Sequence, residues 1–171
     1  MAPPGALAAA ARLRDSETVA IVTGQQAGLF GGPLFTLLKA LTAIRLAERT
    51  AAEHGVPTVA IFWIDAEDHD WDEVKACGVL DAELNLVHIA LDDPPVAGEG
   101  PVVRVRLDNS AHAATAMLAS TLAATEFSPR LLEAVRLAYT PGVGMAEAFG
   151  AWLESLLGPR GLVVFDASDP G

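Results

Sequence analysis

Two buried-strand patterns on either side of one amphipathic helix constrain the fold of this chain more than any other feature. Residues 18–23 and 58–64 are short apolar runs rich in β-branched side chains, which is typical of strands buried on both faces. Between them, apolar residues recur at helical spacing over residues 34–53, and glycine and proline mark both ends of that segment. A strand, a helix and a strand in this order form a βαβ unit with a right-handed crossover. The sequence therefore predicts an α/β fold, a parallel sheet with helices on both faces.

The rest of the chain adds two weaker strand patterns, further helices and a final strand. Residues 84–91 and 102–107 favour a half-exposed antiparallel pair, joined by a loop over residues 92–101 that is rich in proline and glycine. Residues 161–166 form a last buried-type run, expected beside the first two strands. A parallel sheet rarely ends on an uncovered strand, so we expect residues 1–171 to be one domain that is cut short. Helical patterns cover residues 109–124, 128–138 and 144–157.

The composition argues against several classes of protein. An apolar fraction of 51% is too high for a disordered tail, and a net charge of −11 disfavours a nucleic-acid-binding role, which needs cationic side chains against phosphates. No apolar run reaches the ~18 residues that span a membrane, and the N-terminal apolar stretch lacks the order of charges of a secretory signal. The single cysteine, Cys77, fits a reducing compartment. We therefore expect a cytoplasmic protein that binds neither nucleic acid nor membrane.

A loop rich in glycine and glutamine follows the first predicted strand. Its glycines, Gly24, Gly28, Gly31 and Gly32, allow positive φ angles and close approach by a ligand, and the loop leads to a helix N-terminus that favours anions. Neither the P-loop nor the dinucleotide-binding spacing is present. The glycines could serve a tight turn alone. The amides of Gln25 and Gln26, which offer both donors and acceptors, favour ligand binding instead.

An acidic stretch around one histidine follows the second predicted strand. Asp70 or Asp72 could cap a short helix, with other acids favouring its dipole. The carboxylates could bind magnesium, with His69 available to a transition metal, although the EF-hand pattern is absent. Alternatively, His69 could act in acid–base chemistry or the carboxylates could bind a substrate amine. The carboxylates of the stretch are Asp65, Glu67, Asp68, Asp70, Asp72 and Glu73.

Several segments together match one known family, in the same order along the chain. The match runs from about Thr18 to the end. Its most specific parts are the glycine–glutamine loop and the quartet Glu-Asp-His-Asp at residues 67–70. The other matching segments are residues 39–41, 62–64, 138–142, 146–149 and 161–170. On these residues the chain resembles the bacillithiol biosynthesis cysteine-adding enzyme, a family described as cysteine ligases.

The resemblance implies a reaction and an architecture. The family is expected to join cysteine to glucosaminyl-malate through an amide bond, in the last step of bacillithiol synthesis. Its core resembles the Rossmann-like nucleotide-binding domain of class I aminoacyl-tRNA synthetases, which suggests ATP and Mg²⁺ as cofactors. Full-length members also carry an N-terminal helical segment and a C-terminal coiled-coil region, which implies a homodimer, and both regions are expected to be missing here.

The residues and the resemblance together predict one site. Lys39 could lie near the phosphates or could be a solvated helix residue. The metal ligands stay unassigned. The predicted catalytic residues are Glu67, Asp68, His69 and Asp70, and the predicted substrate- or nucleotide-binding residues are Gly24, Gln25, Gln26, Gly28, Gly31, Gly32, Lys39, Ser168 and Asp169.

Two other functions stay open from the sequence. One is a different class I synthetase-like nucleotidyltransferase or ligase that acts on another acid or amino acid. The other is a truncated, non-catalytic segment that binds a small ligand.

Overall fold

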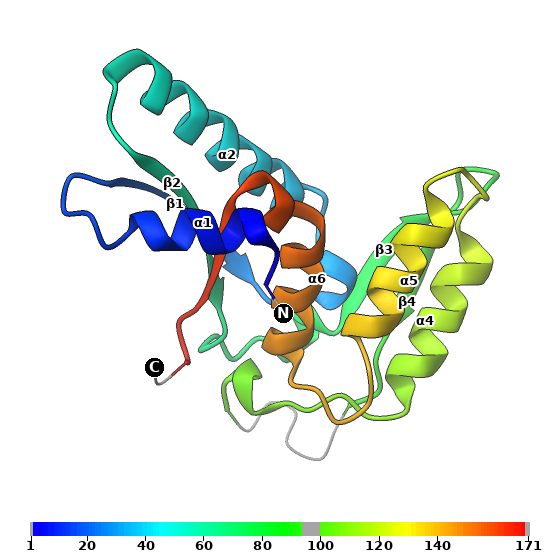
Figure 1. The fold of residues 1–171 in the computed structure, drawn as a ribbon. Coiled ribbons are helices and arrows are strands. Elements are labelled where there is room, and N and C mark those ends of the chain that lie inside the picture. Colours follow the sequence, from blue (N-terminus) through cyan, green and yellow to red (C-terminus); the bar gives the residue numbers. More distant parts are fainter. Residues whose placement is uncertain (1, 94–99, 170–171) are drawn as a thin grey trace.

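The three predicted buried strands form one parallel sheet. The computed structural model describes residues 2–93 and 100–169. In it, β1 (Val19–Gln26), β2 (Thr58–Asp65) and β5 (Leu162–Asp166) pair in the order β1-β2-β5 (Figure 1). The pairing of β1 with β2 continues in register from Val19↔Thr58 to Gln26↔Asp65. The predicted Rossmann-like α/β class and the neighbouring parallel strands are therefore confirmed.

Helix α2 (Phe35–His54) crosses between β1 and β2, as the sequence predicted. Three of its five buried residues are alanines, Ala40, Ala43 and Ala47, and the helix packs against both β1 and β2. The helix ends at Gly55, whose φ of 67° is the left-handed conformation that favours glycine at this position.

Helix α6 (Met145–Leu157) covers the same face of the sheet as α2. The Phe149 ring of α6 lies 5.9 Å from the Phe62 ring of β2. Thr23 pairs with Phe62 in the β1–β2 register, so its side chain points to the same face, and it lines a groove with residues of α2. The two longest helices thus share one face. Helix α1 (Pro4–Arg12) packs against β5, β2 and the turn η3 (Gly158–Arg160).

The antiparallel pair exists, but with a partner that the sequence did not reveal. Strand β4 (Leu86–Ala90) lies within the predicted segment and pairs with β3 (Ala76–Leu80). Residues 102–107 are not a strand. They begin with the short helix η2 (Val102–Arg104), and the side chains of Val102, Val105 and Leu107 are buried, whereas Val103 is exposed. The N–H groups of Val102 and Val103 donate to carbonyls just after β2, which holds the segment against the sheet. Residues 94–99 of the predicted loop lie outside the described residues.

The remaining helices agree with the sequence to within a few residues. Helix α4 (Ser110–Thr121) packs against β3 and β4, and helix α5 (Ser128–Ala138) packs against α4 and α6; this group lies to one side of the main sheet in Figure 1. A short helix, α3 (Trp71–Val74), precedes β3. Buried side chains from the sheet, from α2 and α6 and from this second group form one continuous apolar cluster.

The turn η1 (Leu29–Gly31) depends on a glycine beside Trp152 of α6. Gly31 has a φ of 98°, and a Cβ atom there would lie 2.3 Å from the indole ring. We expect Gly31→Ala to lower the free energy of unfolding by about 2 to 5 kcal/mol, because strain and overpacking act together. The measurement is urea denaturation.

Gly55→Ala is the matched control for this prediction. Gly55 also has a positive φ, of 67°, but a Cβ atom there would meet no other atom within 4 Å. Only the backbone cost of about 1 to 2 kcal/mol applies. Equal losses of unfolding free energy in the two variants would show that the Trp152 indole is not what excludes a side chain at residue 31.

Candidate functional site

The carboxyl ends of β1 and β2 bring the two predicted loops into contact. Gln25 and Gln26 are the last two residues of β1, rather than part of a loop. The Gln26 side-chain N–H donates to Asp68 Oδ2 at 2.7 Å and to Glu73 Oε2 at 3.0 Å. The sequence placed Glu73 in the acidic stretch but not in the site. The structure therefore brings the glutamine motif and the acidic stretch together at one edge of the sheet.

A chain of hydrogen bonds connects this contact to Lys39 on α2. The Lys39 ammonium donates to Gln25 Oε1 at 2.9 Å and to the Gly24 carbonyl at 3.1 Å. The Gln25 amide then donates to Gln26 Oε1 at 2.8 Å. A cation thus stands at one end of a fixed row of amides, with carboxylates at the other. Lys39 binds the strand end, so it is not simply a solvated helix residue.

Asp68 is held as a carboxylate. The backbone N–H of Asp70 donates to Asp68 Oδ1 at 3.0 Å. This hydrogen bond, followed by the Gln26 amide and the nearby His69, lowers the pKa of Asp68 below its usual value. Asp68 therefore stays negatively charged under mildly acidic conditions and can attract a cationic group.

Two of the predicted acids have structural roles. Asp70 caps α3, because its Oδ1 accepts the Glu73 N–H at 3.0 Å. Asp72 pairs with the Lys75 ammonium at 2.6 Å. Capping therefore accounts for Asp70, as one reading of the sequence predicted, whereas Glu67 and His69 are exposed beside Asp68.

The acidic stretch does not gather into a metal site in the part of the chain that the structure describes. Within residues 2–93 and 100–169, no three His, Cys, Asp or Glu side chains are arranged to hold a metal ion. The carboxylates point to different partners, such as the Gln26 amide, the α3 N-terminus and Lys75. These residues alone do not fit a protein-held Mg²⁺.

The glycine loop is held from inside by Tyr139, a residue that follows α5. The Tyr139 hydroxyl donates to the Gly28 carbonyl at 3.1 Å and accepts the Gly31 N–H at 3.3 Å. Its ring packs edge-on against Phe30, at 5.1 Å between centroids. Full burial raises the pKa of Tyr139 above its usual value. From the sequence, Tyr139 was assigned only to a turn. The one feature that could have drawn attention to it is that it is the single tyrosine of the chain.

The N–H groups of three loop glycines bind within the loop. Gly28 donates to the Gln26 carbonyl, Gly31 to the Gly28 carbonyl and Gly32 to the Leu29 carbonyl, at 2.9 to 3.1 Å. These three N–H groups therefore have partners within the protein. The backbone that approaches Gly28 closely belongs to the protein's own loop, because a Cβ atom on Gly28 would lie 2.6 Å from Gly32 Cα.

Ser168 and Asp169 lie at the same edge of the sheet, beyond β5. The N–H and hydroxyl groups of Ser168 donate to Asp166 Oδ1 at 2.9 and 2.6 Å. In the strand register, Ile64 of β2 lies between Asp166 and Gln25. Strands two places apart are separated by about 9 to 10 Å. Ser168 and Asp169 therefore share the carboxyl edge with the glutamines and follow a strand two places away from β1.

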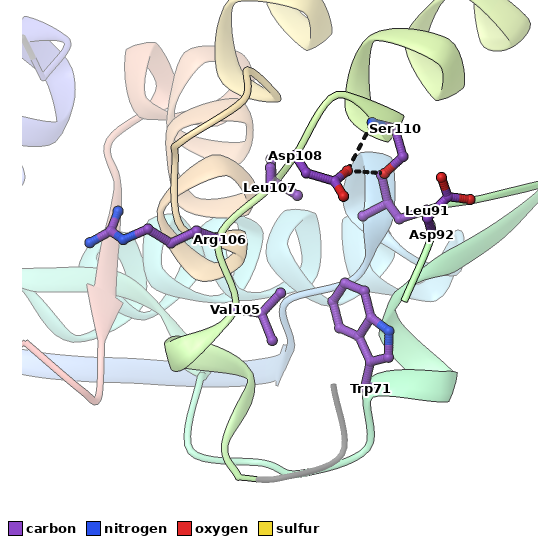
Figure 2. A pocket seen from close by; sticks show the side chains of 8 residues that line it. All are labelled: Trp71, Leu91, Asp92, Val105, Arg106, Leu107, Asp108 and Ser110. Atoms are coloured by element: carbon purple, nitrogen blue, oxygen red, sulfur yellow. Dashed lines mark hydrogen bonds between the residues drawn. The ribbon is translucent and has the colours of Figure 1, made fainter. Parts of the chain in front are cut away.

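The small pocket beside α3 is too small for a substrate. Its volume is about 10 Å³, roughly one water molecule. In Figure 2 the Trp71 ring faces Val105 while Arg106 points away, and Asp108 binds Ser110. Trp71 is buried and its indole N–H donates to Asp93 Oδ1 at 2.9 Å, so this ring serves packing.

A larger apolar cavity borders the glycine loop. Its volume is about 280 Å³, and Gly31, Cys77 and Trp152 contribute to its lining. Burial raises the pKa of Cys77 to about 11. The thiol therefore stays protonated near neutral pH, as expected of a packed side chain rather than a nucleophile.

Removal of the Tyr139 hydroxyl should destabilise the fold and loosen the loop. Tyr139→Phe leaves the buried Gly28 carbonyl without this donor, so we expect a loss of about 1 to 3 kcal/mol in the free energy of unfolding. Thermal and urea denaturation measure it. Thr115→Val, which removes a hydroxyl bound to the Ala111 carbonyl within α4, should cost about 0.5 kcal/mol or less. A similar loss in both variants would contradict a special role for Tyr139.

The raised pKa of Cys77 predicts slow alkylation that accelerates at high pH. Iodoacetamide reacts with the thiolate, so the rate in the native chain should keep rising toward pH 11. The same chain in urea should level off near pH 9, as an ordinary thiol does. Because the unfolded state loses this proton first, the stability should fall as pH rises above about 9. Identical profiles in the two states would contradict the burial argument.

The described helices give no membrane-spanning candidate. None of the helices within residues 2–93 and 100–169 combines the length and the apolar character needed to cross a bilayer.

Comparison with known proteins gives a consistent result. The family model "Bacillithiol biosynthesis BshC, N-terminal Rossmann-like domain" matches residues 3–171. Proteins named "Putative cysteine ligase BshC" from Salinibacter ruber and Heliobacterium modesticaldum are each 37% identical over 92% of this chain, and one from Koribacter versatilis is 35% identical over 98%. The chain spans only 28 to 30% of the length of these relatives. The chain belongs to the BshC family of bacillithiol biosynthesis, and its residues 3–171 match the family's N-terminal Rossmann-like domain.

Proposed function

We propose that this chain is the N-terminal part of a ligase that joins cysteine to glucosaminyl-malate in bacillithiol biosynthesis. Family membership supports the reaction class. The observation that carries the proposal within the molecule is the contact between Gln26 and Asp68 at the carboxyl edge of the parallel sheet. Ligands of open α/β sheets bind at this edge.

The charges of the site suit an amine substrate. Asp68 and Glu73 both accept hydrogen bonds from the Gln26 side-chain amide. Glu73 is exposed to solvent, and so are both chain neighbours of Asp68. A substrate ammonium group could take the place of one of these amide hydrogen bonds. We assign the binding of the glucosamine amine to Asp68, with Gln26 as the residue that fixes its orientation.

The amine must lose a proton before it can form an amide. His69 is exposed next to Asp68, and an imidazole near neutral pH can accept a proton from a bound ammonium group. Asp70 acts indirectly, because it holds the start of α3 and so positions Glu73. Ser168 and Asp169 would extend the same edge toward the other substrate.

The cysteine carboxyl needs activation, which ATP with Mg²⁺ would supply. Lys39 is the cationic side chain fixed at the end of β1, so we assign to it the contact with an anionic group there. Three loop glycines use their N–H groups internally, and the residues that the structure describes gather no group of side chains that could hold a metal ion. The free Cys77 fits a protein of the reducing cytoplasm. A homodimer of the full-length protein is part of the same proposal.

A second function, ligand binding without catalysis, is favoured by one observation. The loop glycines and Asp70 have partners within the protein, so part of the predicted site is used for structure. In this case the chain would bind cysteine or the amine without joining them.

The experiment compares these functions in a chimera that joins this chain to the remaining part of the Salinibacter ruber relative. The chimera and the intact relative are incubated with cysteine, glucosaminyl-malate, ATP and Mg²⁺, and bacillithiol is measured by mass spectrometry. We expect product from both. An active relative and a folded but inactive chimera that still binds radiolabelled cysteine would support binding alone. Product with a different amine, but none with glucosaminyl-malate, would support another ligase.

Substitution of His69 in the chimera tests the proposed base. His69→Ala should lower the rate about 100-fold or more, the usual range for loss of a general base, with little change in melting temperature. His112→Ala is the matched control, since His112 is an exposed histidine on α4. An unchanged rate in His69→Ala would remove His69 from the mechanism and leave the acidic stretch with its capping role.

A further inference from the structure

The turn η2 is attached to the candidate site through its backbone. The Val102 N–H donates to the Asp68 carbonyl at 2.8 Å, and the Val103 N–H donates to the Ala66 carbonyl at 2.9 Å. The Val102 side chain is buried, so the turn is anchored on its inner side as well. Arg104, the last residue of η2, follows Val102 by two residues, which is at most about 7 Å of chain. The turn therefore holds an arginine beside Asp68.

The side chain of Arg104 is available to a ligand. It is exposed, and its guanidinium lies against the backbone just before η2, since Nη1 would be 3.2 Å from a Cβ atom placed on Gly100. Within residues 2–93 and 100–169, this guanidinium has neither a hydrogen bond nor an ion pair. All five of its N–H donors can therefore bind a carboxylate or a phosphate.

Three other cations near the carboxyl edge are already in use. Lys39 binds the end of β1, at 2.9 Å from Gln25 Oε1. Lys75 pairs with two carboxylates, at 2.6 and 2.8 Å. Arg106 donates to the Gly142 carbonyl at 3.0 Å. Arg104 differs from these three because its donors are unoccupied.

The proposed amine substrate creates a need for a cation at this place. Glucosaminyl-malate carries carboxylates as well as an amine. The net charge of −11 and the acidic stretch beside the amine site both repel those carboxylates. A positive group held close to Asp68 offsets this repulsion and gives a carboxylate a direct partner.

We propose that Arg104 binds a carboxylate of the substrate whose amine is bound at Asp68, and so selects an amino sugar that bears a carboxylate over an uncharged one. The inference rests on the proposed function, because it takes the Asp68 edge as the amine site. Arg104 makes no contact with the reacting nitrogen, so it acts on substrate binding and not on amide formation. Its planar guanidinium can hold a carboxylate through two parallel hydrogen bonds, which an ammonium group does not match.

Equilibrium binding tests the inference without the reaction. The probes are glucosaminyl-malate and methyl glucosaminide, which has the same amine but a methyl group in place of malate. In calorimetric titrations of the chain and of the chimera, we expect glucosaminyl-malate to bind at least about 10-fold more tightly. Arg104→Ala should remove most of this preference and leave the affinity for methyl glucosaminide within about twofold. Arg104→Lys should keep part of the preference, because the charge remains.

Three further measurements separate recognition from a structural role. Arg130→Ala is the matched control, since Arg130 is an exposed arginine on α5, and it should change neither affinity. Asp68→Asn should weaken the binding of both compounds, because both carry the amine. In the chimera, Arg104→Ala should raise KM for glucosaminyl-malate at least about 10-fold and leave kcat within about twofold.

The results that would overturn the inference are distinct from one another. Equal weakening of both compounds by Arg104→Ala would make Arg104 a structural residue of η2. Unchanged binding in Arg104→Ala, with both compounds weakened by Asp68→Asn, would leave the proposed function in place and remove Arg104 from it. Weaker binding of radiolabelled cysteine, with glucosaminyl-malate unaffected, would assign Arg104 to the cysteine carboxylate instead. Failure of both compounds to bind the chain and the chimera would contradict the amine site itself, and this inference with it.

Discussion

The parallel pairing of β1 with β2 is the interaction on which the site depends. The register continues to the last residue of both strands, Gln26↔Asp65. It therefore places the Gln26 amide 2.7 Å from Asp68, although the two residues are 42 positions apart in the chain. A shift of one residue would turn every side chain of β1 to the other face of the sheet. The chemistry at this edge thus rests on backbone hydrogen bonds and on the apolar packing that fixes the register.

The glycine loop shows how a motif can serve structure and ligand binding together. Trp152 occupies the space that a side chain at Gly31 would need, and the Tyr139 hydroxyl binds the backbone of Gly28 and Gly31. The loop thereby receives a fixed shape from α6 and the end of α5, two elements far along the chain. A rigid loop holds the start of α2, and α2 carries Lys39 to the end of β1. Pre-organisation of this kind reduces the entropic cost of ordering a binding site.

The sequence by itself determined the types of most elements and the limits of the long helix, because periodicity and glycine or proline punctuation are local signals. It also placed the glutamine motif and the acidic stretch at the carboxyl edge, since each follows a predicted strand. Only the tertiary structure decided that β4 pairs with β3, that the loop N–H groups bind internally, that Lys39 reaches back to Gln25, and that α2 and α6 share a face. These features are contacts between segments distant in sequence, and their energies depend on how the elements pack rather than on any residue pattern within one of them.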